Sequence, residues 1–141
     1  MIARQVVVGA DGRAKAYRPL PANARVAAVV AGMEAYAAGD YFEAHELMEP
    51  AWMGTDDLAE RALIQGLIKV AAADVHAVRG NPKGVRRNLE GARDRLRSGS
   101  AGTITGVELD VAGLLASIDS RLAALDGAGT DGPLAIDWRR R

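Results

Sequence analysis

Hydrophobic residues recur every three or four positions along most of the chain, which is the spacing of amphipathic helices. Residues 22–38 are rich in alanine and carry this spacing, and Gly39 ends the pattern where a helix would stop. Asp40 follows as the N-cap of a second helix over residues 41–53. With Asp40 at the cap, Glu43 occupies the third helical position, and the two side chains predict a capping box.

Three more helices follow from similar signals. A third helix runs from an acidic cap at residues 55–57 to about Val78. Asn81 and Pro82 open a fourth helix in the favoured order of a cap followed by proline. Asp110 caps the last helix, whose inner face is a regular series of leucine, isoleucine and valine.

The remaining segments give weaker signals. Residues 98–106 form a glycine- and serine-rich loop, residues 127–141 show no usable period, and residues 5–8 are the only strand candidate. Pro50 interrupts the second helix, so we expect a kink there, or an end near Met48 and a restart. The patterns together predict an all-α fold, a compact bundle of about five helices with short irregular N- and C-terminal segments, in one domain.

Composition narrows the classes of protein that fit. Hydrophobic residues make up 49% of the chain, which is enough for a folded core, although aromatic residues make up only 4%. The absence of cysteine excludes a disulfide scaffold, a thiolate metal site and a cysteine nucleophile. The opening residues do not suit a signal peptide and no apolar stretch is long enough to span a bilayer, so we expect a cytoplasmic protein without membrane partners.

Acidic and basic residues balance at 18 each but are segregated along the chain. Residues 26–60 hold eight acids and no base, whereas residues 61–97 hold nine bases and three acids. This pattern favours two parts of one fold that face each other, and a homo-oligomer would use the same complementarity. The bases of the fourth helix alternate with acids and lack aromatic neighbours, so nucleic-acid binding is not expected.

The third helix carries a line of polar residues that needs partners. Residues 62–78 are apolar almost all the way round, which predicts a central, buried helix. Gln65, Lys69 and His76 fall within about 40° of one another on the helical wheel, while Asp74 lies on the opposite side. A buried amide or ammonium group without a hydrogen-bond partner destabilises the fold. We therefore expect polar groups from another element to contact these three side chains.

The second helix supplies candidate partners. His45, Glu46 and Glu49 share the arc opposite its apolar side. Phe42 and Met53 lie in the same arc, and two large apolar groups in an acidic face predict that the face is covered. We therefore expect the histidine and the two glutamates to be partly buried opposite the polar line of the third helix.

These two helices resemble a known family. The runs YFEAHELMEPAW (residues 41–52) and ALIQGLIKVAAADVHAVRGNPKGVRRNLEGARDRL (residues 62–96) are similar to the family catalogued as domain of unknown function 309, and the likeness spans residues 32–97. The resemblance implies a small all-helical fold from bacteria and archaea with no established activity. The motif positions fall here on Phe42, Glu43, His45, Glu46, Glu49, Trp52, Gln65, Gly66, His76, Gly80 and Asn81.

One hypothesis makes the polar cluster a binding or catalytic site. His45 and Glu49 are spaced i,i+4, so they reach the same point above the helix, and His76 from the facing helix would complete a metal site for zinc, manganese or iron. His45, Glu46 and Glu49 are also the candidate catalytic groups of a hydrolase that activates water. The side chains expected to bind a small-molecule ligand are Gln65, Lys69, His76 and Trp52.

A second hypothesis needs no ligand. The same His, Glu and Gln side chains would form a buried hydrogen-bond network inside a non-enzymatic helical module for structure or interaction. The motifs of helical di-iron proteins, zinc peptidases and serine hydrolases are absent from the sequence, which lowers the expectation of a metal or of nucleophilic serine chemistry. Contacts among these side chains distinguish the two hypotheses.

Overall fold

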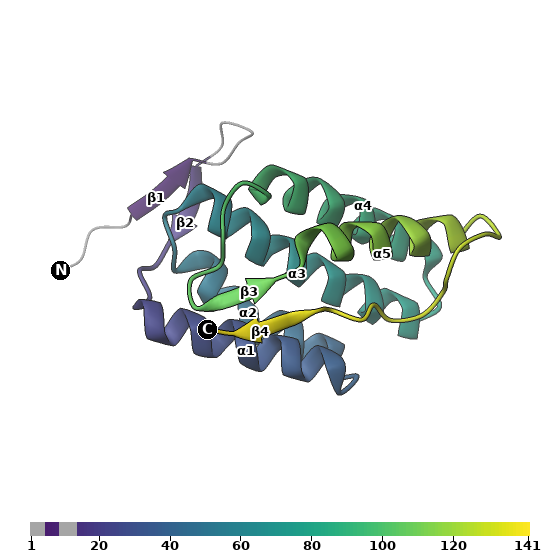
Figure 1. The fold of residues 1–141 in the computed structure, drawn as a ribbon, viewed down its shortest axis with the longest axis horizontal. Helices are drawn as coiled ribbons and strands as arrows, with labels where there is room; N and C mark the ends of the chain where they lie inside the picture. Colours follow the sequence, from purple (N-terminus) through teal and green to yellow (C-terminus); the bar gives the residue numbers. More distant parts are fainter. Residues whose placement is uncertain (1–4, 9–13) are drawn as a thin grey trace.

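The computed structural model describes residues 5–8 and 14–141. The elements in this part of the chain are α1 (Ala22–Ala37), α2 (Tyr41–Met53), α3 (Leu58–Val78), α4 (Pro82–Gly99), α5 (Val111–Ala124), β1 (Gln5–Val8), β2 (Ala14–Tyr17), β3 (Val107–Leu109) and β4 (Trp138–Arg140). The prediction of a bundle of five helices is confirmed (Figure 1). None of the helices described is both long enough and apolar enough to cross a membrane.

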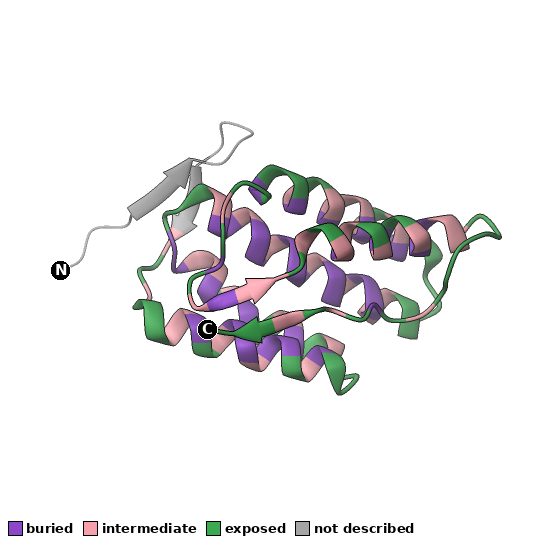
Figure 2. Ribbon diagram, in the orientation of Figure 1, coloured by how far each residue is buried: buried purple, intermediate pink, exposed green. Residues whose placement is uncertain are grey.

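Helix α3 is the centre of the bundle. It packs against α4 and α2, and α1 packs in turn against α2. Buried residues run along most of the length of α3, whereas the outer surfaces of α1 and α4 are exposed (Figure 2). Gly66 allows the close approach of α4, because a Cβ atom at this position would lie 2.7 Å from Leu96 Cγ. The central helix α3 thus lies between α2 and α4, and the predicted polar cluster belongs to α2 and α3.

The helix starts follow the capping signals at three places. The side chains of Asp57, Asn81 and Asp110 each accept a hydrogen bond from a backbone N–H in the first turn of α3, α4 and α5, at 3.0, 3.2 and 2.9 Å. These bonds explain why the predicted starts of the three helices agree with the structure.

The capping box at Asp40 and Glu43 is wrong. The side chain of Asp40 makes no capping hydrogen bond, and its N–H instead donates to Ala35 O at 2.9 Å in the turn that closes α1. Because this N–H is already satisfied, Glu43 has no capping role and lies exposed. Of the two outcomes expected at Pro50, an end of the helix near Met48 is not observed, because α2 continues through the proline to Met53. Because proline has no N–H to donate to the carbonyl of Glu46, the helix continues past Pro50 with one backbone hydrogen bond fewer.

Short strands join the terminal segments to the bundle. The predicted strand at residues 5–8 is present as β1 and pairs antiparallel with β2. The segment after residue 127, which has no usable period, crosses back over the helices and ends in β4, which pairs antiparallel with β3 (Figure 1). Leu134 within it is buried, and its N–H donates to Tyr36 Oη at 2.9 Å. This tail is thus part of the fold, bound to α1 and to the loop that precedes α5.

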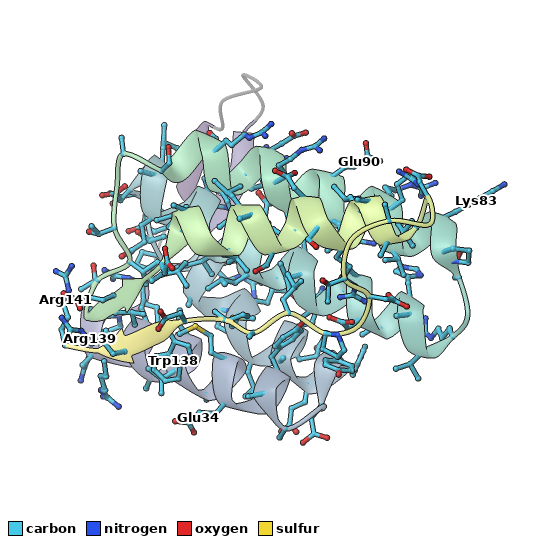
Figure 3. All side chains as sticks on the ribbon, turned by 45° about the vertical axis from the view of Figure 1, so that its right-hand side comes forward. Glu34, Lys83, Glu90, Trp138, Arg139 and Arg141 are labelled. Atoms are coloured by element: carbon cyan, nitrogen blue, oxygen red, sulfur yellow. The ribbon has the colours of Figure 1, made fainter. Side chains whose placement is uncertain are left out.

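Among the described residues, the bases of α4 form no ion pair with the acidic segment at residues 26–60. Arginines of α4 pair with acidic residues in and after α5: Arg93 Nη1 lies 3.7 Å from Asp119 Oδ1, and Arg86 Nη2 lies 2.7 Å from Asp126 Oδ1. In the described part of the chain, no ion pair links α2 to α4. Lys83 and Glu90 on α4 project away from the body of the protein (Figure 3). The acidic side chains of α2 are left for other partners.

Candidate metal and ligand site

A cavity of about 270 Å³ lies between α2, α3 and α4 and collects most of the predicted site residues. Helix α3 forms its floor, because the polar line on this otherwise apolar helix emerges between its two neighbours. The lining residues are His45, Glu49, Trp52, Gln65, Ile68, Lys69, Ala72 and Asn88. His45 and Glu49 of α2 therefore share one cavity with Gln65 and Lys69 from the middle of α3, as the sequence suggested.

Three side chains of α2 form a compact group of potential metal ligands at the edge of this cavity. One nitrogen of His45 and one oxygen each of Glu46 and Glu49 all lie within 4.8 Å of one another. His45 Nδ1 is 3.2 Å from Glu46 Oε1. All three residues remain partly or fully accessible, so an ion from solution can reach them.

The imidazole of His45 is held from one side by an aromatic ring. The Phe42 and His45 rings stack with centroids 6.4 Å apart and an interplanar angle of 14°. The opposite face of α2 is anchored by Ala44, Met48 and Ala51, which are buried in the core. This anchoring fixes the rotation of α2 and directs the imidazole and the two carboxylates outward together.

Lys69 brings a cation to the opposite wall of the cavity. Burial lowers the pKa of its ammonium group, and the positive charge of Arg95 lowers it further. The stem of Lys69 passes over Gly91 of α4, where a Cβ atom would lie 3.0 Å from Lys69 Cδ. Among the residues that the structure describes, neither Lys69 nor Glu49 forms a hydrogen bond or an ion pair through its side chain.

Trp52 contributes a hydrogen-bond donor without a partner. Its Nε1 atom is buried and forms no hydrogen bond within the described residues. The guanidinium carbon of Arg61 lies 4.7 Å from the centre of the indole ring, so a cation–π contact holds the ring in place. The indole thus lines the cavity, while its N–H is buried and has no hydrogen-bond partner among the described residues.

His76 is placed apart from this group. Its Nδ1 lies 3.1 Å from Asn81 Nδ2, and its ring packs against Gly84 at the turn between α3 and α4. It neither lines the cavity nor joins the three potential ligands of α2. The structure therefore does not bring His76 to His45 and Glu49.

The acidic face of α2 is also more open than the sequence indicates. Phe42 is 63% exposed, and Glu43 and Glu46 are exposed as well. The expected cover over this face is absent in the described residues of the chain, although Met53 is half-buried. Phe42 is therefore a surface residue and does not belong to the core.

A buried polar network that the sequence did not reveal as such lies on the other side of α3. Asp74 Oδ2 accepts a hydrogen bond of 2.5 Å from Tyr36 Oη, and Asp74 Oδ1 accepts one of 2.6 Å from Arg121 Nη2. Burial and the negative charge of Asp74 raise the pKa of Tyr36. Asp74 and Arg121 are each only 2% exposed, so this network is closed to solutes and holds the fold together. The sequence indicated this network only through Asp74, which lies on the opposite side of the third helix from Gln65, Lys69 and His76.

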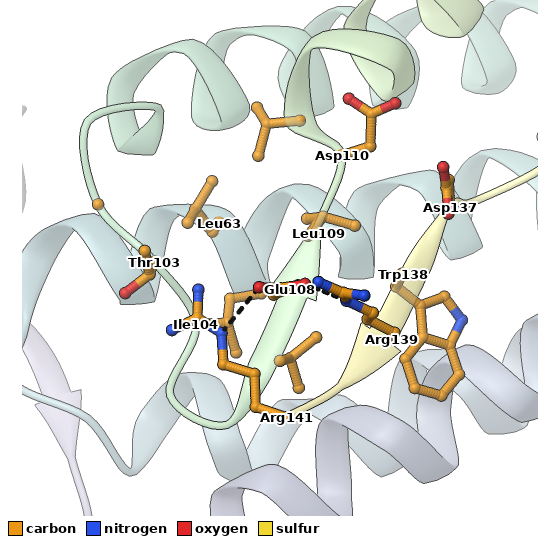
Figure 4. Close-up of a pocket in the computed structure, with 13 residues that line it drawn as sticks. Leu63, Thr103, Ile104, Glu108, Leu109, Asp110, Asp137, Trp138, Arg139 and Arg141 are labelled. Carbon is orange, nitrogen blue, oxygen red and sulfur yellow. Dashed lines mark hydrogen bonds and ion pairs between the residues drawn. The ribbon is translucent and has the colours of Figure 1, made fainter.

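A larger cavity, of about 520 Å³, borders β3 and β4 at one end of the protein (Figures 3 and 4). Its most prominent charges neutralise one another. Glu108 forms an ion pair with Arg139 and lies 3.7 Å from Arg141 Nε, between the two arginines (Figure 4). The charges of Glu108, Arg139 and Arg141 in this cavity are thus paired with one another.

Fold and site together define a small helical bundle with a polar cavity and a possible His/Glu/Glu metal-binding group. Residues 29–88 match the model of the family described as Domain of unknown function (DUF309), which confirms the resemblance carried by the sequence motifs. This stretch contains every residue that lines the cavity, from His45 to Asn88. No curated protein and no solved structure matches the chain.

Proposed function

We propose that this protein binds a divalent transition-metal cation through His45, Glu46 and Glu49. The observation that carries the proposal is the convergence of one imidazole nitrogen and two carboxylate oxygens within 4.8 Å at the edge of a cavity. Nitrogen and oxygen donors of this kind suit zinc, manganese and iron. Two carboxylates held close together repel each other, and a cation between them removes that repulsion.

The cavity beside these ligands supports a second part of the proposal, the binding of a small anionic molecule. Lys69 and Gln65 carry hydrogen-bond donors on the walls of the cavity, and Lys69 brings a positive charge. A carboxylate or phosphate group fits such donors, and its other end would reach the cation. Three protein ligands leave coordination positions open, and a cation bound in this way lowers the pKa of a water molecule, which is the chemistry of hydrolysis.

The alternative is a helical module in which the same side chains form a hydrogen-bond network. That hypothesis requires contacts among the side chains of α2 and α3. Within the described residues, the contact between His45 and Glu46 is the only hydrogen bond or ion pair of the cluster, and both residues belong to α2. The open cavity between the helices therefore favours binding over a satisfied network.

Metal content tests the first part of the proposal. The untagged protein, purified without chelator, should bind about one equivalent of Zn²⁺ or Mn²⁺ by elemental analysis and calorimetry. Glu49→Gln removes one ligand at nearly constant shape and should weaken binding at least about tenfold. Glu43→Gln makes the same change on the exposed surface of α2, outside the group of three, and should bind as the wild type does.

Two results would overturn the metal site. One is the absence of bound metal in the wild type, and the other is equal binding by both glutamine variants. Inorganic phosphate then tests the second part, with the metal-loaded protein as the sample. Lys69→Met should weaken phosphate binding at least about tenfold while leaving the metal content unchanged. Equal phosphate binding by the wild type and Lys69→Met would overturn the proposed anion site. The proposed metal site would not be affected by this result.

A further inference from the structure

The most exposed large apolar side chains of the described chain lie in one groove. Phe42, near the start of α2, is 63% exposed, and Val78, the last residue of α3, is 76% exposed. Both line a groove of about 410 Å³, together with Tyr41 and Val75. Single exposed apolar residues are normal on a protein surface, but large ones that share a concave surface mark a contact site.

The charges around this groove are divided between its two sides. Asp40 and Glu43 of the α2 side are acidic, and Arg79 at the end of α3 is basic. All three side chains are exposed, and none forms an ion pair with a described residue. The groove therefore has an apolar centre, an acidic rim and a basic rim, with the charges of both rims unpaired.

We propose that this groove is the contact surface of a two-fold symmetric dimer of the chain. A rotation of 180° about the centre of the groove places the basic rim of one protomer over the acidic rim of its partner, and the reverse contact forms at the same time. Arg79 then meets Glu43 twice, and the Phe42 and Val78 side chains of the two copies pack together at the centre. An unrelated partner needs a surface evolved to match, whereas a second copy already carries both rims.

The segregation of charge along the chain supports a second copy as the occupant. Acids of the segment before residue 61 and bases of the segment after it do not pair between α2 and α4 within the described chain. The groove lies where these two segments meet on the surface, at Glu43 and Arg79. Pairing between copies therefore uses complementarity that the fold itself leaves unused.

Sedimentation velocity over a wide concentration range tests the dimer. The patch is small, so we expect a dissociation constant on the order of micromolar and a dimer fraction that rises between about 1 µM and about 500 µM. Val78→Ser should weaken dimerisation by roughly tenfold to a hundredfold, because each dimer loses two valine contacts. Leu58→Ser is the matched control, since Leu58 is the first residue of the same helix, is 51% exposed and does not line the groove.

A charge exchange tests the orientation of the two copies. Glu43→Arg and Arg79→Glu should each weaken the dimer about tenfold or more, because each places like charges opposite one another. The variant with both substitutions should recover dimerisation, since every Arg–Glu contact is restored with reversed sign. A protein that stays monomeric over the whole range overturns the dimer, and so does equal weakening by Val78→Ser and Leu58→Ser. Failure of the double variant to recover overturns the two-fold arrangement.

This proposal does not depend on metal binding. Val78 is the last residue of α3 and Arg79 follows it, and neither belongs to the group of metal ligands or to the cavity at α2. Loss of dimerisation in Val78→Ser should leave the metal content unchanged, and the two proposals can fail separately.

Discussion

Glu60 shows how a carboxylate stays charged inside this protein. It is only 3% exposed, and burial alone would raise its pKa. Hydrogen bonds from Thr105 and Thr55 and the charge of Arg25 outweigh this effect, so the pKa is lowered. The Thr105 N–H donates to Glu60 Oε2 at 2.6 Å, and Arg25 Nε lies 3.2 Å from Glu60 Oε1. One side chain thus connects the start of α1, the start of α3 and the loop before β3.

The lowered pKa of Glu60 predicts a specific response to acid. The unfolded chain, with a glutamate pKa of about 4.3, takes up the proton more readily than the folded protein does. The contribution of Glu60 to stability is therefore complete above that pH and is lost as the pH falls through the lower, folded pKa. Glu60→Gln should lower the free energy of unfolding by about 1–3 kcal/mol at pH 7. Below about pH 4, the free energy of unfolding of this variant should fall less steeply with pH than that of the wild type.

Urea unfolding at several pH values measures both effects. Glu34→Gln is the control, because Glu34 is exposed on α1 and points to solvent (Figure 3). It should behave as the wild type at every pH. Parallel pH profiles for Glu60→Gln and the wild type would show that Glu60 does not carry the acid dependence.

At the scale of the elements, the helices could be predicted where a local signal exists. Asp57, Asn81 and Asp110 cap the helices that they were expected to cap, because each side chain needs only a backbone N–H three residues away. The strands of the tail have no such signal. Their pairing joins residues about thirty positions apart, such as Val107 and Arg140, and nothing in either segment alone specifies it.

The candidate site was predictable in direction but not in position along the helix. A helical wheel places Gln65, Lys69 and His76 on the same side of the helix. It does not show how far apart they lie along the helix axis. His76 lies seven residues beyond Lys69, which is about 10 Å along the helix axis. It therefore contacts Asn81 in the turn between α3 and α4 and does not reach the cavity. The wheel also assigned the acidic face of α2 to the interior, since Phe42 is apolar. The structure leaves Phe42 exposed, because no other described element extends over that side.

The contact between α3 and α4 yields a prediction at this scale. Gly66→Ala places a Cβ atom 2.7 Å from Leu96 Cγ, inside a packed core, so the helices must separate. We expect a loss of about 1–3 kcal/mol in the free energy of unfolding, even though alanine favours helix formation by about 1 kcal/mol. Gly91→Ala in α4 meets only the flexible stem of Lys69 and should be neutral or stabilising by up to about 1 kcal/mol. Chemical denaturation of the two variants compares them directly, and an equal loss in both would contradict the packing argument.

For the whole molecule, the buried network joins segments from the two ends of the described chain. Tyr36 of α1 donates to Asp74 of α3 and accepts from the N–H of Leu134 in the tail. Arg121 of α5 completes the network, with burial opposing its charge and Asp74 supporting it, so that its pKa is raised. The polar network thus links three helices and the tail, and Leu134 of the tail also belongs to the apolar core.

Removing the hydroxyl group of Tyr36 should therefore loosen the tail more than the helical bundle. Tyr36→Phe deletes the donor to Asp74 and the acceptor of the Leu134 N–H, which leaves two buried polar groups with fewer partners. We expect a loss of about 1–3 kcal/mol in global stability and faster amide exchange from the tail, at Leu134 first. Tyr41→Phe is the control, because Tyr41 contacts the Tyr36 ring but forms no side-chain hydrogen bond in the described part of the protein. Unchanged exchange at Leu134 would show that this hydrogen bond does not hold the tail.

The separation of Tyr36 and Leu134 by 98 positions has a consequence for synthesis on the ribosome. At about 5–20 residues per second, roughly 5 to 20 seconds pass between the addition of the tyrosine and that of the leucine. During this interval the nascent helices can collapse on one another, but the hydroxyl of Tyr36 still lacks the donor that it has in the finished protein. The contact between Leu134 and Tyr36 therefore forms only after all five helices have been synthesised, and until then Tyr36 and Asp74 are open to chaperones.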